Sequence, residues 1–294
     1  MAFVRAPAPA ARIVRQWLLA APNPDKSLMV AAFPPVDQAL QMTDRIVLAR
    51  TLDALLLPEK FRDYGPNGLQ VEGRQEIRKI VSGVTASLAF IHAAIDREAD
   101  AVLVHHGLFW RGQDGRVTGW MKKRLALLLA HDVNLFAYHL PLDAHPELGN
   151  NAQLGQRLGL SGAERFGEQD MGWLGCRTDG QRFSDAQALA LHIENVLHRA
   201  VTVVEPAEPR EIRRVAWCSG GAQAYFEAAI EAGADAFITG EISEPQAHYA
   251  RECGVAYLAC GHHATERFGA PAVAGHVAAQ LSLAHEFIDI DNPA

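Results

Sequence analysis

The chain has 294 residues, of which 49% are hydrophobic and 21% are charged, and its formal net charge is −7 at pH 7. That length and apolar content supply a core for one large or two ordinary domains and exclude a globally disordered chain. The net negative charge disfavours nucleic acid as the main partner, because phosphate groups require a basic surface. No apolar run reaches the roughly 18 residues that a membrane-spanning helix needs, so we expect no membrane partner.

The four cysteines, Cys176, Cys218, Cys253 and Cys260, are widely spaced and form no C-x-x-C pair. This usage is typical of a reducing compartment and indicates a cytoplasmic protein. We expect each cysteine to serve as a small buried apolar side chain.

Residues 1–41 differ in composition from the rest of the chain. They contain six prolines, and their arginines all precede the first acidic residue, Asp25. Proline at this density prevents one continuous helix, which predicts a poorly ordered N-terminal extension. The composition also suits a mitochondrial transit peptide. A start codon assigned too far upstream explains it equally well, because a well-formed pattern begins at Met42. We favour this second interpretation, which keeps the protein in the cytoplasm.

Helical and strand patterns alternate from Met42 onward, which predicts an α/β fold. Helices are expected at 44–57, 88–98, 120–131, 151–158 and 185–199. Strands are expected at 79–85, 101–105, 134–138, 173–176 and 201–204. Pro58 ends the first helix, and Ser87 can cap the second.

The last third of the chain repeats an earlier order of elements. Residues 79–106 align without a gap on residues 214–241, a shift of 235 − 100 = 135 positions, and Ala-Asp-Ala occurs in both copies. We therefore predict two similar α/β halves, residues 42–168 and 169–294, which form one metal-binding unit. Their mixed sheets are covered by helices, and the strand ends of both halves face a shared cleft.

A pair of histidines, His105 and His106, ends the strand that begins at Ala101, and Gly107 supplies the turn after it. Ligands of open α/β sheets bind at the carboxyl ends of strands, so this pair is a candidate site. Asp143 follows the next strand. We expect Pro141 to prevent a helical turn there, so that Asp143 projects from a loop.

A third polar group, His262 and Glu266, begins after Gly261. On a helix, residues four apart lie on the same face, so the imidazole and the carboxylate can share a metal ion. Together with His105, His106 and Asp143 they offer three nitrogens and two carboxylates. These are too many ligands for one tetrahedral zinc with an open position, and they suit two divalent ions, Zn, Fe, Mn or Co. The alternative is a set of polar loop residues without metal.

These motifs resemble those of the YbgI-like dinuclear metal-centre proteins, which are also called GTP cyclohydrolase I type 2 homologues. The resemblance covers about residues 42–291. It is carried by Gly65-Pro66-Asn67-Gly68-Leu69-Gln70-Val71, Val104-His105-His106-Gly107-Leu108-Phe109-Trp110, Pro141-Leu142-Asp143 with Gly149-Asn150, Thr239-Gly240-Glu241, and Gly261-His262 with Glu266. It implies two metal ions held by His105, His106, Asp143, His262 and Glu266, with Asp143 and Glu266 as bridging catalytic residues. It also implies a ring-shaped homohexamer whose sites face an internal cavity.

The resemblance points to hydrolysis of GTP, in which metal-bound hydroxide attacks C8 of the purine and formate is released. The sequence contains no phosphate-binding glycine motif. The candidates for phosphate contacts are therefore Arg111, Arg116, Lys122 and Lys123, for which a surface role is the alternative. Two other functions stay open. One is a metal-dependent phosphoesterase or amidohydrolase that acts on another small metabolite. The other is a non-catalytic metal-binding ring that binds a protein partner.

Three further residues near these motifs have open roles. Glu241 is a candidate proton acceptor in catalysis, or else a cap of the following helix. His139 is a further metal ligand or a residue that orients one. His263 reaches the site, or else it orients a ligand or packs.

Overall fold

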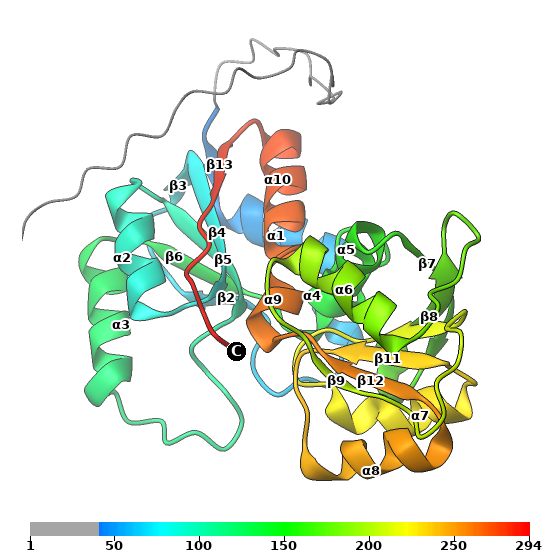
Figure 1. Cartoon of the computed structure of the whole chain (residues 1–294). Helices are drawn as coiled ribbons and strands as arrows, with labels where there is room; N and C mark the ends of the chain where they lie inside the picture. The colour runs from blue at the N-terminus through cyan, green and yellow to red at the C-terminus, as the bar shows by residue number, and fades with distance from the viewer. Residues whose placement is uncertain (1–40) are drawn as a thin grey trace, which may run out of the picture. The chain divides into compact units, whose positions relative to one another are not determined.

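The computed structural model describes residues 41–294, which form two large sheets covered by helices (Figure 1). The predicted extension, residues 1–41, lies outside the described residues except for Gln41. Within the described part, no helix is both long and apolar enough to cross a membrane.

The described residues contain thirteen strands and ten α-helices. The strands are β1 (Thr43–Asp44), β2 (Gly68–Val71), β3 (Glu76–Ile77), β4 (Lys79–Thr85), β5 (Ala101–His106), β6 (Asn134–Ala137), β7 (Leu160–Phe166), β8 (Gly172–Arg177), β9 (Thr202–Val204), β10 (Val215–Trp217), β11 (Ala236–Thr239), β12 (Ala256–Ala259) and β13 (Ala284–Phe287). The helices are α1 (Arg45–Leu56), α2 (Leu88–Asp96), α3 (Gly119–Ala130), α4 (Leu140–Ala144), α5 (Asn150–Arg157), α6 (Ala186–Leu197), α7 (Phe226–Glu231), α8 (Glu244–Cys253), α9 (His262–Glu266) and α10 (Gly269–Leu281). Short 3₁₀ turns cover Pro58–Lys60, Glu168–Asp170 and Gln223–Tyr225.

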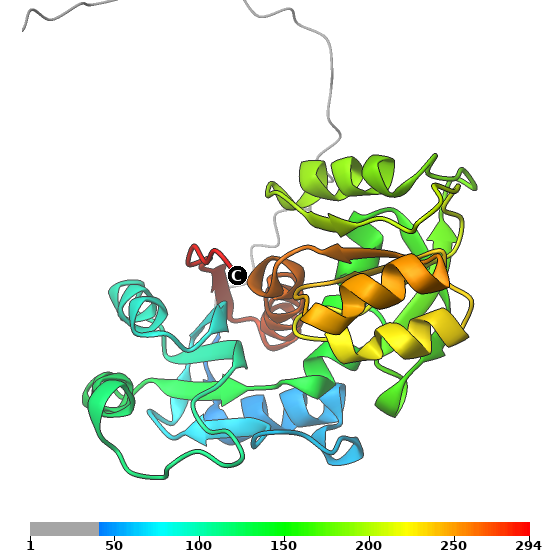
Figure 2. The same ribbon diagram turned by 60° about the horizontal axis from the view of Figure 1, so that its bottom comes forward.

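The first large sheet has five strands in the order β13-β4-β5-β6-β2. β13, β4, β5 and β6 are parallel, and β2 is antiparallel to β6. β4 and β5 are apolar along most of their length because helices cover both of their faces. The helices α1 and α10 lie on one face of the sheet, and α2 and α3 lie on the other (Figure 2). Their apolar side chains pack against the strands.

The second large sheet has six strands in the order β7-β8-β10-β11-β12-β9. β10, β11 and β12 are parallel, whereas β7, β8 and β9 run antiparallel to their neighbours. α5 and α6 pack on one face through the cluster around Trp217, and α7 and α8 pack on the other around Phe237. The predicted α/β class with mixed, helix-covered sheets is therefore confirmed.

Most predicted elements lie where the sequence pattern placed them. β4 matches the prediction, and the Ser87 side chain caps α2 by accepting from the backbone N–H of Phe90. The expectation for Pro141 was wrong, because α4 is a short helix with this proline in its first turn. The first turn leaves backbone N–H groups unused, so the missing N–H of proline does no harm there.

The expectation for the cysteines was half right. All four are free thiols, and Cys218 and Cys260 are buried. Cys176 and Cys253 are exposed, so they are not core side chains. Each lies at the end of an element, where the alternation that buries a strand or helix residue no longer applies.

Two carboxylates 135 positions apart make the same backbone contacts. Asp100 Oδ2 accepts hydrogen bonds from the N–H groups of residues 78 and 79, at 2.7 and 3.0 Å. Asp235 Oδ2 accepts from the N–H groups of residues 213 and 214, at 2.9 and 2.8 Å. Each aspartate, in the loop before one strand, fixes the start of the parallel neighbour. The shift equals that of the sequence repeat.

The division into halves at residues 168 and 169 stays a prediction. The strand order shows a contact across this division, because β13 pairs with β4 in the five-stranded sheet. Residues from the second predicted half therefore complete the sheet that the first half begins.

Asp100→Ala and Asp235→Ala are expected to lower the free energy of unfolding by about 2 kcal/mol each, since each change leaves two N–H groups without their acceptor. Urea unfolding followed by circular dichroism measures the change. Asp114→Ala is the control, because Asp114 is exposed and pairs with nearby Arg116. Unfolding of either buried-aspartate variant at the wild-type urea concentration would contradict this interpretation.

Candidate metal centre

Both histidines at the end of β5 face the same region. The ring centroids of His105 and His106 are 4.4 Å apart. His105 is fully buried, and its Nδ1 lies 3.1 Å from the backbone oxygen of Tyr138. A carbonyl oxygen only accepts, so Nδ1 carries the proton, and the lone pair of the neutral ring is on Nε2. The nitrogen that could bind a metal ion, Nε2, is therefore the one directed away from this backbone oxygen.

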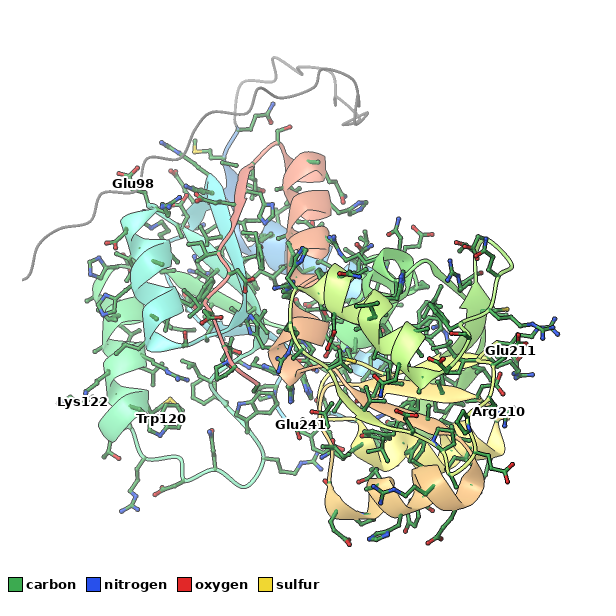
Figure 3. All side chains as sticks on the ribbon, in the orientation of Figure 1. Glu98, Trp120, Lys122, Arg210, Glu211 and Glu241 are labelled. Carbon is green, nitrogen blue, oxygen red and sulfur yellow. The ribbon has the colours of Figure 1, made fainter. Side chains whose placement is uncertain are left out.

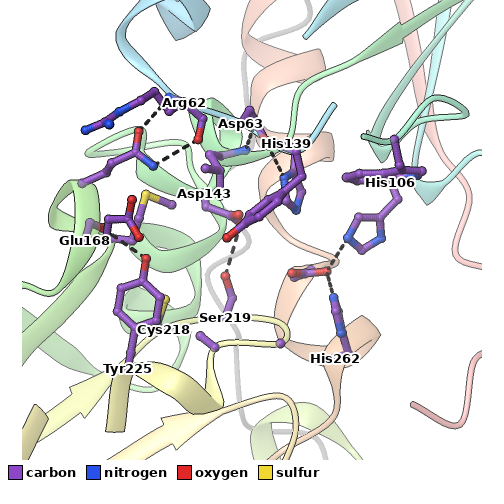
Figure 4. A pocket seen from close by; sticks show the side chains of 18 of the residues that line it. Arg62, Asp63, His106, His139, Asp143, Glu168, Cys218, Ser219, Tyr225 and His262 are labelled. Atoms are coloured by element: carbon purple, nitrogen blue, oxygen red, sulfur yellow. Dashed lines mark hydrogen bonds and ion pairs between the residues drawn. The ribbon is translucent and has the colours of Figure 1, made fainter. Parts of the chain in front are cut away.

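Asp143 is held from two sides at the end of α4. Asn150 Nδ2 donates to Asp143 Oδ1 at 2.8 Å. Ser219 Oγ donates to the same oxygen at 3.3 Å (Figure 4). Asn150 is fully buried, and its own Oδ1 accepts from the N–H of Gly269 at 2.8 Å. The asparagine therefore fixes Asp143 against the start of α10.

Glycines allow Glu266 to enter the site. Gly261, with φ 96°, ends β12 and turns the chain into α9. One helical turn separates His262 from Glu266, and their Nε2 and Oε2 atoms are 3.1 Å apart. Gly220, with φ 68°, lies against the carboxylate, where a Cβ would collide with Glu266 Oε1. The predicted shared face of this helix is confirmed.

The Glu266 carboxylate lies among three imidazoles. His105 Nε2 is 3.3 Å from Oε1, and His106 Nε2 is 3.2 Å from Oε2. His105 Nε2 also lies 3.6 Å from Asp143 Oδ1. With His262, the structure thus brings all five predicted ligands into one cluster. The donor atoms form three overlapping groups, and within each group they all lie within 4.8 Å of one another. The groups are His105, His106 and His139; His106, His262 and Glu266; and His105, Asp143 and Glu266.

The geometry of this cluster fits divalent cations. His105 Nε2 and Glu266 Oε2 are buried, and neither has a hydrogen-bond partner within residues 41–294. Such atoms are costly to bury unless something else satisfies them. Donor atoms on a cation with bonds of about 2.1 Å lie about 3.0 to 3.4 Å apart. Close contact without hydrogen bonding is what a shared cation produces, so these buried groups can hold metal ions.

Two of the histidines carry a second ring proton, and therefore a positive charge, in the metal-free protein at pH 7. Burial lowers the pKa of His105, but the charges of Asp143 and Glu266 outweigh it and raise that pKa to about 9. Burial likewise opposes protonation of His262, and contacts with Glu266 and Glu241 raise its pKa to about 9.

The pKa values of His106, Glu266 and Asp143 are also shifted. Burial and the neighbouring imidazoles lower the pKa of His106 to about 3, against the attraction of Glu266. Although burial opposes it, the positive charge of His105 and the neighbouring imidazoles hold the pKa of Glu266 well below its usual range. Burial raises the pKa of Asp143. Glu266 is therefore the stable anion of the cluster.

Two histidines at the rim each contact a carboxylate. His262 Nδ1 lies 2.7 Å from Glu241 Oε1, and His139 Nδ1 lies 2.7 Å from Asp63 Oδ1. Such a partner fixes the tautomer and ring orientation of a ligand histidine. Burial raises the pKa of Asp63, but hydrogen bonds from His139 and Asn67 outweigh it and lower that pKa to about 2.

Asp63 was missed by the sequence analysis. It lies before the turn-rich stretch 64–68, where no strand or helix pattern places a side chain. The signal that could have found it is Asn67, four residues later, whose Nδ2 donates to Asp63 Oδ2 at 2.9 Å.

The residues with open roles take distinct positions. His139 joins the cluster, with its ring centroid 5.0 Å from that of His105. Glu241 contacts His262 and does not cap α8, because Ser243 forms the capping box there. The alternative of a cap was therefore wrong. His263 is not part of the cluster, and its Nε2 lies 2.8 Å from Asp289 Oδ1.

A cavity of about 590 Å³ opens beside the cluster (Figure 4). Its inner wall includes His106, His139, Asp143, His262 and Glu266. Of the four basic residues that were candidates for phosphate contacts, only Arg111 lines this cavity. Lys122 is exposed on α3, away from Glu241 in Figure 3. Arg116 pairs with Asp114.

The fold and the cluster define a class of protein: a helix-covered α/β chain with a buried histidine–carboxylate site that can hold metal ions. The family model for Duf34/NIF3 (NGG1p interacting factor 3) matches residues 44–293. The chain belongs to this family.

Relatives named "GTP cyclohydrolase 1 type 2 homolog" are similar over nearly their whole length. One from Neisseria meningitidis serogroup A is 54% identical over 234 residues, which cover 80% of this chain and 92% of the relative. One from Pseudomonas aeruginosa is 46% identical over 250 residues, covering 84% and 97%.

Solved structures agree with this assignment. The structure titled as protein ybgI of unknown function has a TM-score of 0.82 and 44% identity, and the match covers 86% of this chain and 100% of that one. A protein from Thermus thermophilus has a TM-score of 0.75 and 33% identity, with the same coverage. The resemblance noted in the sequence is confirmed.

Cation binding at pH 7 is expected to release protons. His105 and His262 have pKa values of about 9 in the metal-free protein, so both are protonated at pH 7, whereas a metal ligand must be the neutral imidazole. The affinity should therefore rise with pH until about pH 9. Calorimetric titration with Zn²⁺ in two buffers of different ionisation enthalpy counts the protons.

His248→Ala is the matched control, because His248 is exposed and pairs with Glu244, its neighbour on α8. This variant should release as many protons as the wild type. Heats that do not depend on the buffer would count against the proposed protonation of the cluster.

Proposed function

We propose that the chain holds two divalent ions, Zn, Fe, Mn or Co, on His105, His106, Asp143, His262 and Glu266. The support is the shared position of Glu266, whose two oxygens each lie within 3.3 Å of an imidazole nitrogen. Asp143 and Glu266 are the bridging residues in this proposal. Divalent ions at this place would supply Lewis acidity and lower the pKa of a bound water to near 7.

The chain's own residues prepare this site for hydrolysis. Asn150 donates to Asp143 Oδ1, the oxygen that lies 3.6 Å from His105 Nε2, and so fixes this carboxylate beside the cluster. Glu241 accepts the Nδ1 proton of His262, which keeps the Nε2 lone pair directed at Glu266. Glu241 is partly exposed, so it can also receive a proton from a reacting water, and we assign it a catalytic role on this ground.

The proposed substrate is GTP, whose purine ring would be opened at C8 with release of formate. The support is the shared name of the relatives, "GTP cyclohydrolase 1 type 2 homolog", at 44–54% identity. The cavity has the volume that a nucleotide-sized ligand requires. A metal-dependent phosphoesterase or amidohydrolase would use the same residues on another small metabolite.

A structural role for the ions is the second candidate function, and one observation favours it. His105 and His106 end a strand of the five-stranded sheet, whereas His262 begins the helix after a strand of the six-stranded sheet. Ions between them would join the two sheets without catalysing a reaction. The protein would then be a metal-binding ring with a protein partner.

The proposed assembly is a cytoplasmic, ring-shaped homohexamer of subunits with two α/β halves. The resemblance to YbgI-like proteins supports the ring. The equivalent backbone hydrogen bonds of Asp100 and Asp235 support the division into two similar halves.

Formate release from GTP by the metal-loaded protein is the test of the hydrolase. Asp143→Ala should reduce the rate by a factor on the order of 100 or more, because it removes a bridging ligand, while native mass spectrometry still detects the hexamer. Glu244→Ala, an exposed residue of α8, should keep the wild-type rate.

Each other result selects one of the alternatives. Turnover of a generic phosphodiester without turnover of GTP would replace the proposed reaction with that of a phosphoesterase. Loss of the ring on metal removal, with no turnover of any substrate, would replace catalysis with the structural role.

A further inference from the structure

We infer that the cavity beside the cluster recognises a ligand with a flat aromatic ring and an anionic group, of the class of purine nucleoside phosphates. The ring lies against Tyr64 and Trp110, and the anionic group lies near Arg62 and Arg111. This inference rests on the proposed function and assigns the side chains that recognise its substrate.

Two aromatic side chains extend the inner wall of the cavity. The Trp110 ring lies 5.0 Å from that of His139 and 5.9 Å from that of His106, between ring centroids. Tyr64 lies 6.1 Å from His139 and remains 60% exposed. Both rings line the cavity. Aromatic side chains stack on nucleobases because every base has a flat π-face.

Two arginines line the same cavity, and neither has an acidic partner among residues 41–294. The Arg62 side chain has no hydrogen bond or ion pair among the residues that the structure describes. Arg111 Nη2 donates to the backbone oxygen of Asp63 at 2.8 Å, and that acceptor carries no net charge. Both guanidinium charges are therefore free to bind a phosphate, for which arginine supplies paired donors.

A strained segment braces Arg62. Gln169 and Asp170 both have left-handed backbone conformations, with φ of 53° and 56°. Residues other than glycine adopt this conformation at an energetic cost, and such strain concentrates at ligand sites. Gln169 Oε1 accepts from the N–H of Arg62 at 2.8 Å, and Gln169 Nε2 donates to its carbonyl oxygen at 3.3 Å. The strained turn thus holds Arg62 at the cavity.

Exposure and position set the orientation of the ligand. Arg62 and Arg111 are exposed, Trp110 is half-buried, and the cluster carboxylates are buried. In Figure 4, Arg62 lies across the cavity from His106 and His262. A ligand therefore enters with its ring toward the cluster and keeps its charged end at the mouth.

Binding of GTP and of guanosine to the full-length, metal-loaded protein tests the inference, by calorimetry at low temperature. Arg62→Gln should weaken GTP binding about tenfold and leave guanosine binding unchanged, because only GTP carries phosphates. Trp110→Leu should weaken the binding of both GTP and guanosine, because it removes the aromatic ring on which the base stacks. Glu168→Gln is the matched control, since it removes an exposed carboxylate that lines the same cavity and should not weaken GTP binding. Metal content is measured for each variant.

Equal losses for GTP and guanosine in Arg62→Gln, no loss in Trp110→Leu, or no binding of either ligand to the wild type would each overturn the inference. The outcome is separate from that of the proposed function. Variants that follow the expected pattern in a protein that releases no formate keep the recognition site and reject the hydrolase. Formate release by a protein whose variants bind GTP and guanosine as the wild type does would keep the hydrolase and reject the recognition site.

Discussion

The structure depends on one buried negative charge, that of Glu266. The residue is 3% exposed, and a carboxylate can be taken out of water only where opposite charge or strong donors replace its hydration. Three imidazoles surround it, and Gly220 provides the space for its Oε1. Protonated histidines balance the charge in the metal-free protein, and divalent ions would balance it in the loaded one. The chemistry of the site follows from this exchange of protons for metal.

Hydrogen bonds hold the loop after β10 beside this charge. The N–H of Gly220, after β10, donates to Thr265 Oγ1 at 2.9 Å, which ties this loop to α9. The N–H of Ser219 donates to Asn151 Oδ1 at 2.8 Å, which ties it to α5. Asn151 and Thr265 are fully buried. A buried polar network of this kind fixes one arrangement, since any shift leaves donors without acceptors.

The five residues of the cluster could be predicted from the sequence because local patterns surround most of them. His105 and His106 end an apolar run, and His262 and Glu266 have helical spacing, so local patterns placed them. Asp143 was predicted for the wrong reason, because proline in the first turn of α4 is compatible with a helix. The short α4 offered no periodicity of its own.

Residues that act through irregular segments could not be predicted in the same way. Asp63 lies in an irregular segment and Gln169 in a short 3₁₀ turn. Their partners are 76 and 107 positions away in the sequence. Contacts at such separations depend on how the two sheets pack, which no local pattern encodes. The pairing of β13 with β4 has the same cause, because a four-residue strand gives no signal for its neighbour.

Elemental analysis of the purified full chain, after exposure to Zn²⁺ or Mn²⁺ and removal of free metal, tests the central claim most directly. The account predicts about two ions per chain in the wild type and the loss of at least one in Glu266→Gln, a variant whose fold is checked by circular dichroism. A folded wild-type protein that retains no stoichiometric ion, or a Glu266→Gln variant that retains both, would contradict it.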